Sequence, residues 1–166
     1  CLLMLRAASG EGAPCWVTNV HLAGDPLKFD ERRSQLVSAR RRINAMCERN
    51  GISASSPGIV CGDFNESPAG PNHVDFMREW ELSDAFAHVA DLSTFRGWGR
   101  SDRIDFIYHS TGLKPTAVRL PLRPTLEKRL RWSLDYPPWP EYLPTSWFPS
   151  DHVPLAATFE LMSSTP

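Results

Sequence analysis

Two polar residues, Asp63 and Asn65, directly follow a short apolar segment, and both are of types that bind cations or phosphate oxygens. The segment covers residues 59–62 and ends in glycine. Because the side chains of an extended chain alternate between two faces, Asp63 and Asn65 are expected to point the same way. A turn is predicted at residues 66–68, which include a proline. Alone, this pattern equally fits an Asx-turn that closes a buried strand.

Further carboxylate, imidazole and amide groups stand near the ends of other apolar segments. A histidine alone in an apolar strand is more often a core residue, so the prediction depends on the whole set. Phosphoryl chemistry needs carboxylates that hold a hard divalent cation and orient water, together with donors for phosphate oxygens. It also needs a histidine fixed by a carboxylate. The set that meets these needs is Asn19, His21, Asp63, Asn65, Asp105, Asp151 and His152.

Hydrophobic periodicity predicts the elements that would position these groups. Strands are predicted at residues 2–7 and 15–22, joined as a hairpin, and at 59–62, 103–110, 117–120 and 153–161, the last closing the sheet. Helices are predicted at 29–50 and 72–80, and loops at 93–99 and 121–149. The mixture indicates an α/β layered fold. In the first helix Arg32 lies near the apolar stripe, which leaves open a snorkelling side chain or one directed to the sheet edge.

Composition limits the class of protein. The chain has 166 residues, 42% hydrophobic and 22% charged, which is ordinary for a globular domain. A net charge of −1 excludes a global field that recruits nucleic acid, and no apolar run is long enough to span a bilayer. The four cysteines, Cys1, Cys15, Cys47 and Cys61, lack zinc-binding spacing and are predicted to be buried thiols. A reducing, intracellular and cytoplasmic location is therefore expected.

Three motifs together resemble the endonuclease/exonuclease/phosphatase superfamily. They are Gly62-Asp63-Phe64-Asn65, Arg103-Ile104-Asp105-Phe106 and the run from Ser150 through Asp151 and His152 to Leu155. Residues 18–22 resemble the strand motif that precedes them, so the resemblance spans about residues 2–161. It implies the deoxyribonuclease-I-like fold, a four-layer α/β sandwich, and phosphodiester hydrolysis that depends on Mg²⁺ or Mn²⁺.

The resemblance also implies roles for the residues that match. Asp63 resembles the carboxylate that orients or deprotonates the attacking water and can bind metal. His152 resembles the histidine that contacts the phosphate or protonates the departing group, and Asp105 resembles its carboxylate partner. Asp151 resembles a metal ligand. The substrate-binding positions are His21, Asn65 and Asn19.

One departure from the family pattern concerns its first motifs. An asparagine on the opening strand and a metal-binding glutamate would lie upstream of residue 2, and no matching segment is present. Residues 1–166 are therefore expected to be the C-terminal portion of a single domain whose N-terminal part is missing from this chain. The parent protein is expected to be an enzyme and the 166 residues alone to be inactive.

The segment 121–149 bears on the substrate. Its basic residues interleave with aromatic ones, which suits single-stranded RNA, although a proline-rich loop pinned by aromatic packing fits equally. The motifs are most similar to the deadenylases of the carbon catabolite repression type and their nocturnin and Angel relatives, which implies a 3′ exoribonuclease. The alternatives are a phosphatase or phosphodiesterase acting on a lipid, inositol phosphate or nucleotide, an abasic-site endonuclease, and an inactive binding module. The oligomeric state is not predicted.

Overall fold

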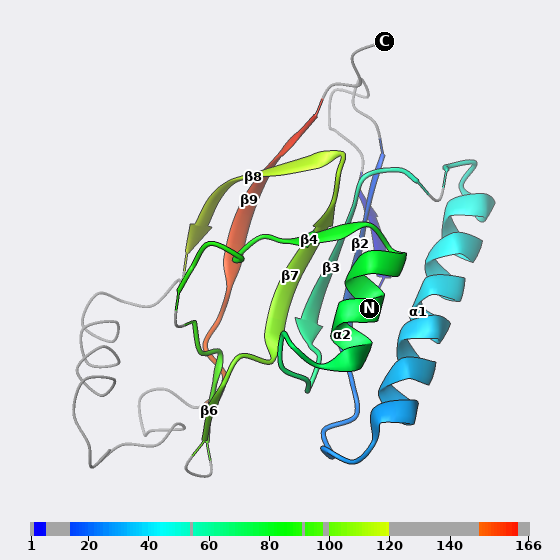
Figure 1. Ribbon diagram of the computed structural model, residues 1–166. Helices are drawn as coiled ribbons and strands as arrows, with labels where there is room; N and C mark the ends of the chain where they lie inside the picture. The colour runs from blue at the N-terminus through cyan, green and yellow to red at the C-terminus, as the bar shows by residue number, and fades with distance from the viewer. Residues whose placement is uncertain are drawn as a thin grey trace.

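A five-stranded mixed sheet forms the centre of the chain in the computed structural model (Figure 1). The structure describes residues 2–5, 14–53, 55–90, 92–97, 100–119 and 150–162. The strands lie in the order β1 (Leu2–Leu5), β2 (Cys15–His21), β3 (Gly58–Asp63), β7 (Asp105–Ser110) and β4 (Leu82–Asp84). β1 and β2 are antiparallel, which confirms the pairing expected of the hairpin, and β2 and β3 are parallel.

The strand register brings the predicted polar residues into one row. His21 pairs with Asp63 across β2 and β3, and Asp63 pairs with Asp105 across β3 and β7. The next row joins Asn19, Cys61 and Ile107. Because side chains alternate along each strand, both rows lie on the same face of the sheet. Three segments that are distant in sequence therefore meet at one end of this face.

The opposite face of the sheet is covered by two helices. α1 (Phe29–Arg49) agrees with the helix predicted at 29–50 and buries Leu36, Ile43 and Cys47. α2 (Pro71–Glu79) begins at a proline, which is favoured at the first helical position. Between the helices and the sheet lies an aromatic cluster in which Phe64 contacts the rings of three others, Phe76, Phe106 and Tyr108. This core fixes the strands that carry the polar row.

Arg32 takes neither of the orientations left open by the sequence. Its side chain is buried, and its guanidinium donates to the carbonyl oxygens of Ala23 (3.0 Å), Asp25 (2.7 Å) and Pro26 (3.2 Å). These carbonyls belong to the turn between β2 and α1, where the sheet cannot supply donors. Arg32 therefore holds the segment that follows His21 and does not contact the polar row.

A buried histidine in this core predicts acid sensitivity. His73 forms a hydrogen bond with the Tyr108 hydroxyl, and burial, with the nearby Arg103 charge, lowers the pKa of His73 to about 4. In the unfolded chain His73 takes up a proton near pH 6.5, whereas in the folded chain it does so only near pH 4. The free energy of unfolding therefore falls as the pH drops from 6.5 towards 4. The loss expected at pH 5 is about 2 kcal/mol. Urea unfolding at pH 7 and pH 5 measures it.

The variant His73→Gln should lose this part of the pH dependence. Exposed His88, changed to glutamine in the same way, is the matched control and should retain it. An unchanged difference between pH 7 and pH 5 in the His73 variant would show that the acid sensitivity arises elsewhere.

The last strand does not close the five-stranded sheet, which corrects the prediction for residues 153–161. β9 (Ala156–Leu161) pairs instead with β8 (Leu113–Arg119) in a separate two-stranded sheet. β8 begins at Leu113, before the predicted start at residue 117, and so includes Pro115. Its register shifts between Pro115 and Ala117, an irregularity of the kind at which a strand accommodates proline. Phe159 of β9 contacts the ring of His109 on β7, so this small sheet packs on the face opposite the helices.

Two short strands replace part of the loop predicted at residues 93–99. β5 (Phe95–Gly97) pairs with β6 (Arg100–Asp102), and three residues are too few for a visible alternation. The strand predicted at 103–110 begins at Asp105. The segment 121–149 lies outside the described residues.

Two further predictions concern the described part of the chain. Cys15, Cys47 and Cys61 are free thiols, as predicted, and Cys61 is only partly buried. Within the described ranges, no helix combines the length and apolarity that a membrane crossing requires.

Candidate active site

Asp63 ends β3 in a tight turn that presents its carboxylate. Its Oδ1 accepts the backbone N–H of Asn65 at 2.8 Å, and its Oδ2 lies 3.2 Å from the Asn65 amide nitrogen. Asn65 adopts a left-handed φ of 49°, which asparagine tolerates better than most residues. The Asx-turn and the carboxylate at a site, treated as alternatives from the sequence, are thus the same structure, although the Asp63 side chain is only 13% exposed.

The side chain of Asn65 is already engaged in this turn. Its amide nitrogen also donates to the carbonyl oxygen of Leu22 at 2.8 Å. Both amide hydrogens therefore have acceptors within the protein, and the side-chain oxygen is the group left to face a ligand. A phosphate-binding role through the amide would require the side chain to turn.

Gly62 is required where β3 approaches β2. Its φ is 128°, and a Cβ atom at this position would lie 2.0 Å from the carbonyl oxygen of Val20. Only glycine fits such a backbone. The glycine therefore lets β3 end against β2, with Asp63 beside His21.

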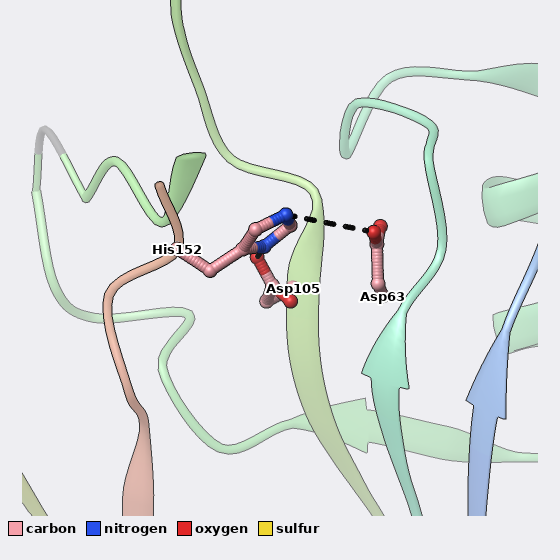
Figure 2. Close-up of side chains that lie close together, drawn as sticks. All are labelled: Asp63, Asp105 and His152. Atoms are coloured by element: carbon pink, nitrogen blue, oxygen red, sulfur yellow. Dashed lines mark hydrogen bonds and ion pairs between the residues drawn. The ribbon is translucent and has the colours of Figure 1, made fainter. Parts of the chain in front are cut away.

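A carboxylate–imidazole pair lies opposite Asp63. Nδ1 of His152 is 2.8 Å from Oδ2 of Asp105, and Nε2 of the same ring is 3.9 Å from Oδ2 of Asp63 (Figure 2). The imidazole thus lies between two carboxylates, and the hydrogen bond to Asp105 leaves Nε2 directed towards Asp63. The expected hydrogen-bond contact between Asp105 and His152 is present.

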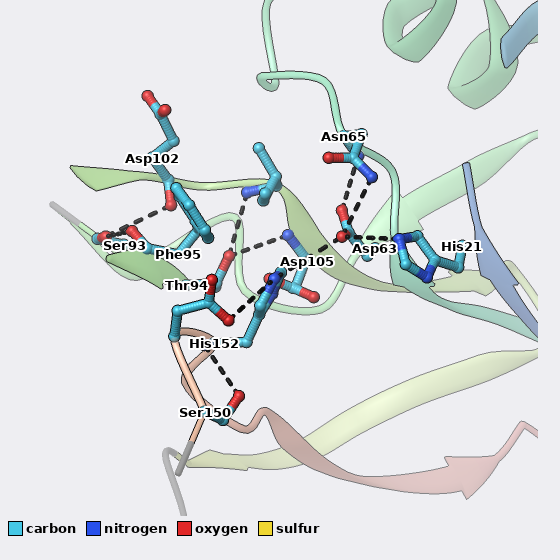
Figure 3. Close-up of polar contacts among 12 residues, drawn as sticks. His21, Asp63, Asn65, Ser93, Thr94, Phe95, Asp102, Asp105, Ser150 and His152 are labelled. Carbon is cyan, nitrogen blue, oxygen red and sulfur yellow. Dashed lines mark hydrogen bonds and ion pairs between the residues drawn. The ribbon is translucent and has the colours of Figure 1, made fainter. Parts of the chain in front are cut away.

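The other predicted residues lie at different distances from this pair. His21 Nε2 is 3.6 Å from Asp63 Oδ2, and the His21 side chain is 78% exposed (Figure 3). Asp151 Oδ1 is 3.9 Å from His152 Nε2. Asn19 lies one row further along β2, where it lines a pocket together with Asp105 and His152. The set predicted from the sequence is therefore gathered at one edge of the sheet.

That pocket has a volume of about 560 Å³ and lies on the sheet face away from the helices. Its walls come from β2, β3, β7 and the segment that carries His152. Asp63, Asn65 and His21 are not among the residues that line this pocket. The pocket offers room for a ligand next to the Asp105–His152 pair.

Electrostatics favours a charged imidazole. Burial by itself lowers the pKa of His152, but the hydrogen bond to Asp105 and the charges of Asp105, Asp63 and Asp151 outweigh it, so the pKa is raised. Burial raises the pKa of Asp63, and the Asp105 charge adds to this, while the Asn65 N–H and the two histidines oppose it. The two groups are thus suited to share protons at a reacting oxygen.

Of the side chains gathered here, the carboxylates are the groups suited to bind a hard divalent cation. Ligand atoms of Asp63, Asp105 and His152 lie within 4.8 Å of one another. Hard cations such as Mg²⁺ take oxygen ligands, which the two carboxylates supply. Of the two predicted metal ligands, Asp63 belongs to this group of three, whereas Asp151 lies outside it, with its Oδ1 3.9 Å from His152 Nε2. Mg²⁺ usually has six oxygen ligands, and the carboxylates of the described residues supply only a few of them.

Sequence reasoning missed two supports of the site. Arg103 forms an ion pair with Asp84 and lies over the Phe106 ring, which ties β7 to β4. Thr94 is fully buried, and its Oγ1 accepts the backbone N–H groups of Ile104 (3.1 Å) and Asp105 (2.9 Å). Arg103 stood within a recognised motif, but Thr94 lies in a segment without periodicity and gave no signal.

The sequence matches the family described as Endonuclease/Exonuclease/phosphatase over residues 32–152. This match covers most of the chain, and the chain belongs to that family. The fold class predicted from the motifs, the α/β fold of this superfamily, is confirmed. The described residues contribute two helices, one five-stranded sheet and two separate two-stranded sheets, β5–β6 and β8–β9.

Among curated proteins, the chain is similar to the CCR4-Not complex 3′-5′-exoribonuclease subunit Ccr4 of two yeasts. It is 27% identical to the Debaryomyces hansenii protein over 184 residues, covering 88% of this chain and 20% of that protein. It is 27% identical to the Candida albicans protein over 179 residues, covering 87% and 21%. The chain therefore spans about a fifth of the length of these relatives.

Solved structures with the same fold include two with similar coverage. The human Nocturnin catalytic domain has a TM-score of 0.63 at 21% identity, over 97% of this chain and 52% of that one. ANGEL2, described as a 2′,3′-cyclic phosphatase, has a TM-score of 0.69 at 21% identity, over 89% and 57%. The chain corresponds to a little over half of each structure, and at this identity the likeness establishes the fold alone.

Proposed function

We propose that residues 1–166 are the C-terminal portion of a single catalytic domain, and that the complete protein is a metal-dependent 3′ exoribonuclease of single-stranded RNA. The observation that carries the proposal is the imidazole of His152, held between Asp105 at 2.8 Å and Asp63 at 3.9 Å. Family membership gives hydrolysis of phosphate esters as the general chemistry. The similarity to Ccr4, which is named as a 3′-5′-exoribonuclease, favours RNA as the substrate.

In the proposed reaction Asp63 orients the attacking water and takes its proton. The water oxygen forms a bond to phosphorus while the bond from phosphorus to the 3′ oxygen of the remaining RNA breaks. His152 donates the Nε2 proton to that departing oxygen, and Asp105 stabilises the charged imidazole through Nδ1. The raised pKa of His152 suits a proton donor at neutral pH.

Phosphate binding is assigned to the neighbouring polar groups. The exposed imidazole of His21 stands beside Asp63, and Asn19 lies one row further along β2 on the same face, so both can donate to phosphate oxygens, whereas Asn65 would do so only if its amide turned away from Leu22. Asp63 and Asp151 would hold Mg²⁺ or Mn²⁺ with ligands from outside the described residues, and the cation would neutralise charge on the scissile phosphate. A cytoplasmic location and a single-stranded RNA partner belong to this proposal.

The test uses the complete protein and a 5′-labelled single-stranded RNA that ends in adenosines. With Mg²⁺ we expect stepwise shortening from the 3′ end and release of nucleoside 5′-monophosphates, and with a chelator no shortening. Internal cleavage at abasic sites, or removal of a terminal 2′,3′-cyclic phosphate without shortening, would replace the proposed activity with another one. Absence of all hydrolysis at high enzyme concentration would favour the binding module.

A further inference from the structure

The segment before β5 connects the two halves of the Asp105–His152 pair. Thr94 is completely buried, although threonine usually lies at the surface. Its hydroxyl oxygen accepts the backbone N–H of Ile104 and of Asp105, and Asp105 is the first residue of β7 (Figure 3). The hydroxyl thus fixes the backbone from which the Asp105 side chain projects.

The backbone of the same residue holds the other half of the pair. The carbonyl oxygen of Thr94 accepts the N–H of Val153 at 2.7 Å, immediately after His152. Phe95 and His152 form an isolated antiparallel bridge, and their rings lie 5.3 Å apart. Apart from this bridge, His152 lies outside the named strands, so these contacts locate its segment relative to β7.

The Thr94 segment is itself tied to the strands on the other side. The backbone N–H of Thr94 donates to the carbonyl oxygen of Asp102 at 3.0 Å, and the carbonyl of Ile104 accepts the N–H of Phe64, next to Asp63, at 2.8 Å. One buried residue therefore lies within two hydrogen bonds of all three predicted catalytic segments.

We propose that Thr94 is a positioning residue whose hydroxyl and carbonyl together set the relative placement of Asp105 and His152. This proposal rests on the proposed function of that pair. Thr94 does not touch the substrate, and it acts by holding the carboxylate and the imidazole at the separation that allows proton transfer. A misplacement of about 1 Å at such a site costs about 100-fold in rate.

The variant Thr94→Val keeps the shape and removes the acceptor, whereas Thr94→Ser keeps the acceptor. In the complete protein we expect Thr94→Val to lower kcat about 100-fold with a smaller change in KM, and Thr94→Ser to retain activity. Ser110→Ala is the matched control, because the Ser110 hydroxyl accepts the N–H of Gly58 at 2.9 Å at the far end of β7. It removes a similar hydrogen bond and should leave kcat unchanged.

A spectroscopic measurement separates positioning from general stabilisation and from the proposed function. A proton on His152 Nδ1 that is shared with a carboxylate gives a far-downfield ¹H resonance, assigned by its loss in His152→Gln. We expect the metal-free Thr94→Val protein to lose this resonance below its unfolding temperature, and Thr94→Ser and Ser110→Ala to keep it.

If Thr94→Val lowers the melting temperature but keeps the resonance and kcat, Thr94 only stabilises the fold and the proposal is overturned. If the complete protein hydrolyses no phosphate ester, the proposed function fails. The resonance then still decides whether Thr94 positions the pair, because its detection requires no turnover.

Discussion

Asp63→Asn is expected to lower the kcat of the complete protein by about 100- to 10,000-fold, the share typical of a general base. Asparagine has the same shape, and its side-chain oxygen can still accept the backbone N–H of Asn65 that closes the turn. The amide cannot take a proton from water, however, and it neutralises the charge that faces His152 Nε2. The change therefore removes the base and keeps the backbone hydrogen bond that closes the turn, while the Asn65 amide loses its acceptor on Oδ2.

The measurement is kcat and KM on single-stranded RNA with Mg²⁺, with the melting temperature recorded for each variant. Asp75→Asn is the matched control, because Asp75 forms a surface ion pair with Arg78 on α2 and lies on the helix side of the sheet. It should retain full activity. Near-normal kcat in Asp63→Asn at unchanged melting temperature would remove Asp63 from the catalytic set.

Much of this site could be predicted because alternation and strand ends are local properties of sequence. Asp63 and Asp105 each stand at one end of a strand whose apolar residues are visible, and this placed both carboxylates at a sheet edge. The pairing of β3 with β7 set Asp63 opposite Asp105, and only the family resemblance could suggest that adjacency. The Asx-turn at Asn65 was one of two alternatives that the residue types left open, and the structure has it.

The missed features depend on contacts between distant segments. β9 has the alternating composition of a sheet strand, but composition does not say which strand it joins, and it pairs with β8 instead of the central sheet. The start of β8 was not predicted because proline is rare inside a strand except at a bulge, and the shift of register next to Pro115 cannot be read from the sequence. Arg32 and Thr94 satisfy backbone groups of other segments, and helical or strand periodicity carries no information about such partners.

Asp105→Asn should have the second large effect, and it should change the pH dependence as well as the rate. The hydrogen bond from His152 Nδ1 and the charge of Asp105 are the main contributions that raise the His152 pKa against the lowering effect of burial. The amide can still accept that hydrogen bond but supplies no charge. The pKa of His152 therefore falls in this variant, and the charged imidazole is lost at lower pH.

If protonated His152 donates to the departing oxygen, the alkaline limb of the kcat profile follows its pKa and should move to lower pH in Asp105→Asn. The limiting kcat should fall by about 100- to 10,000-fold. Without the Asp105 charge, the His152 imidazole is less firmly oriented and is protonated in a smaller fraction of the molecules. Asp151→Asn provides the comparison. Among the interactions that raise the His152 pKa, that of Asp151 is the smallest, and its Oδ1 lies 3.9 Å from His152 Nε2. Asp151→Asn should therefore move the alkaline limb less than Asp105→Asn does. An alkaline limb at the same pH in Asp105→Asn and the unmodified protein would mean that His152 is not the proton donor, and its contribution would then be contact with the phosphate.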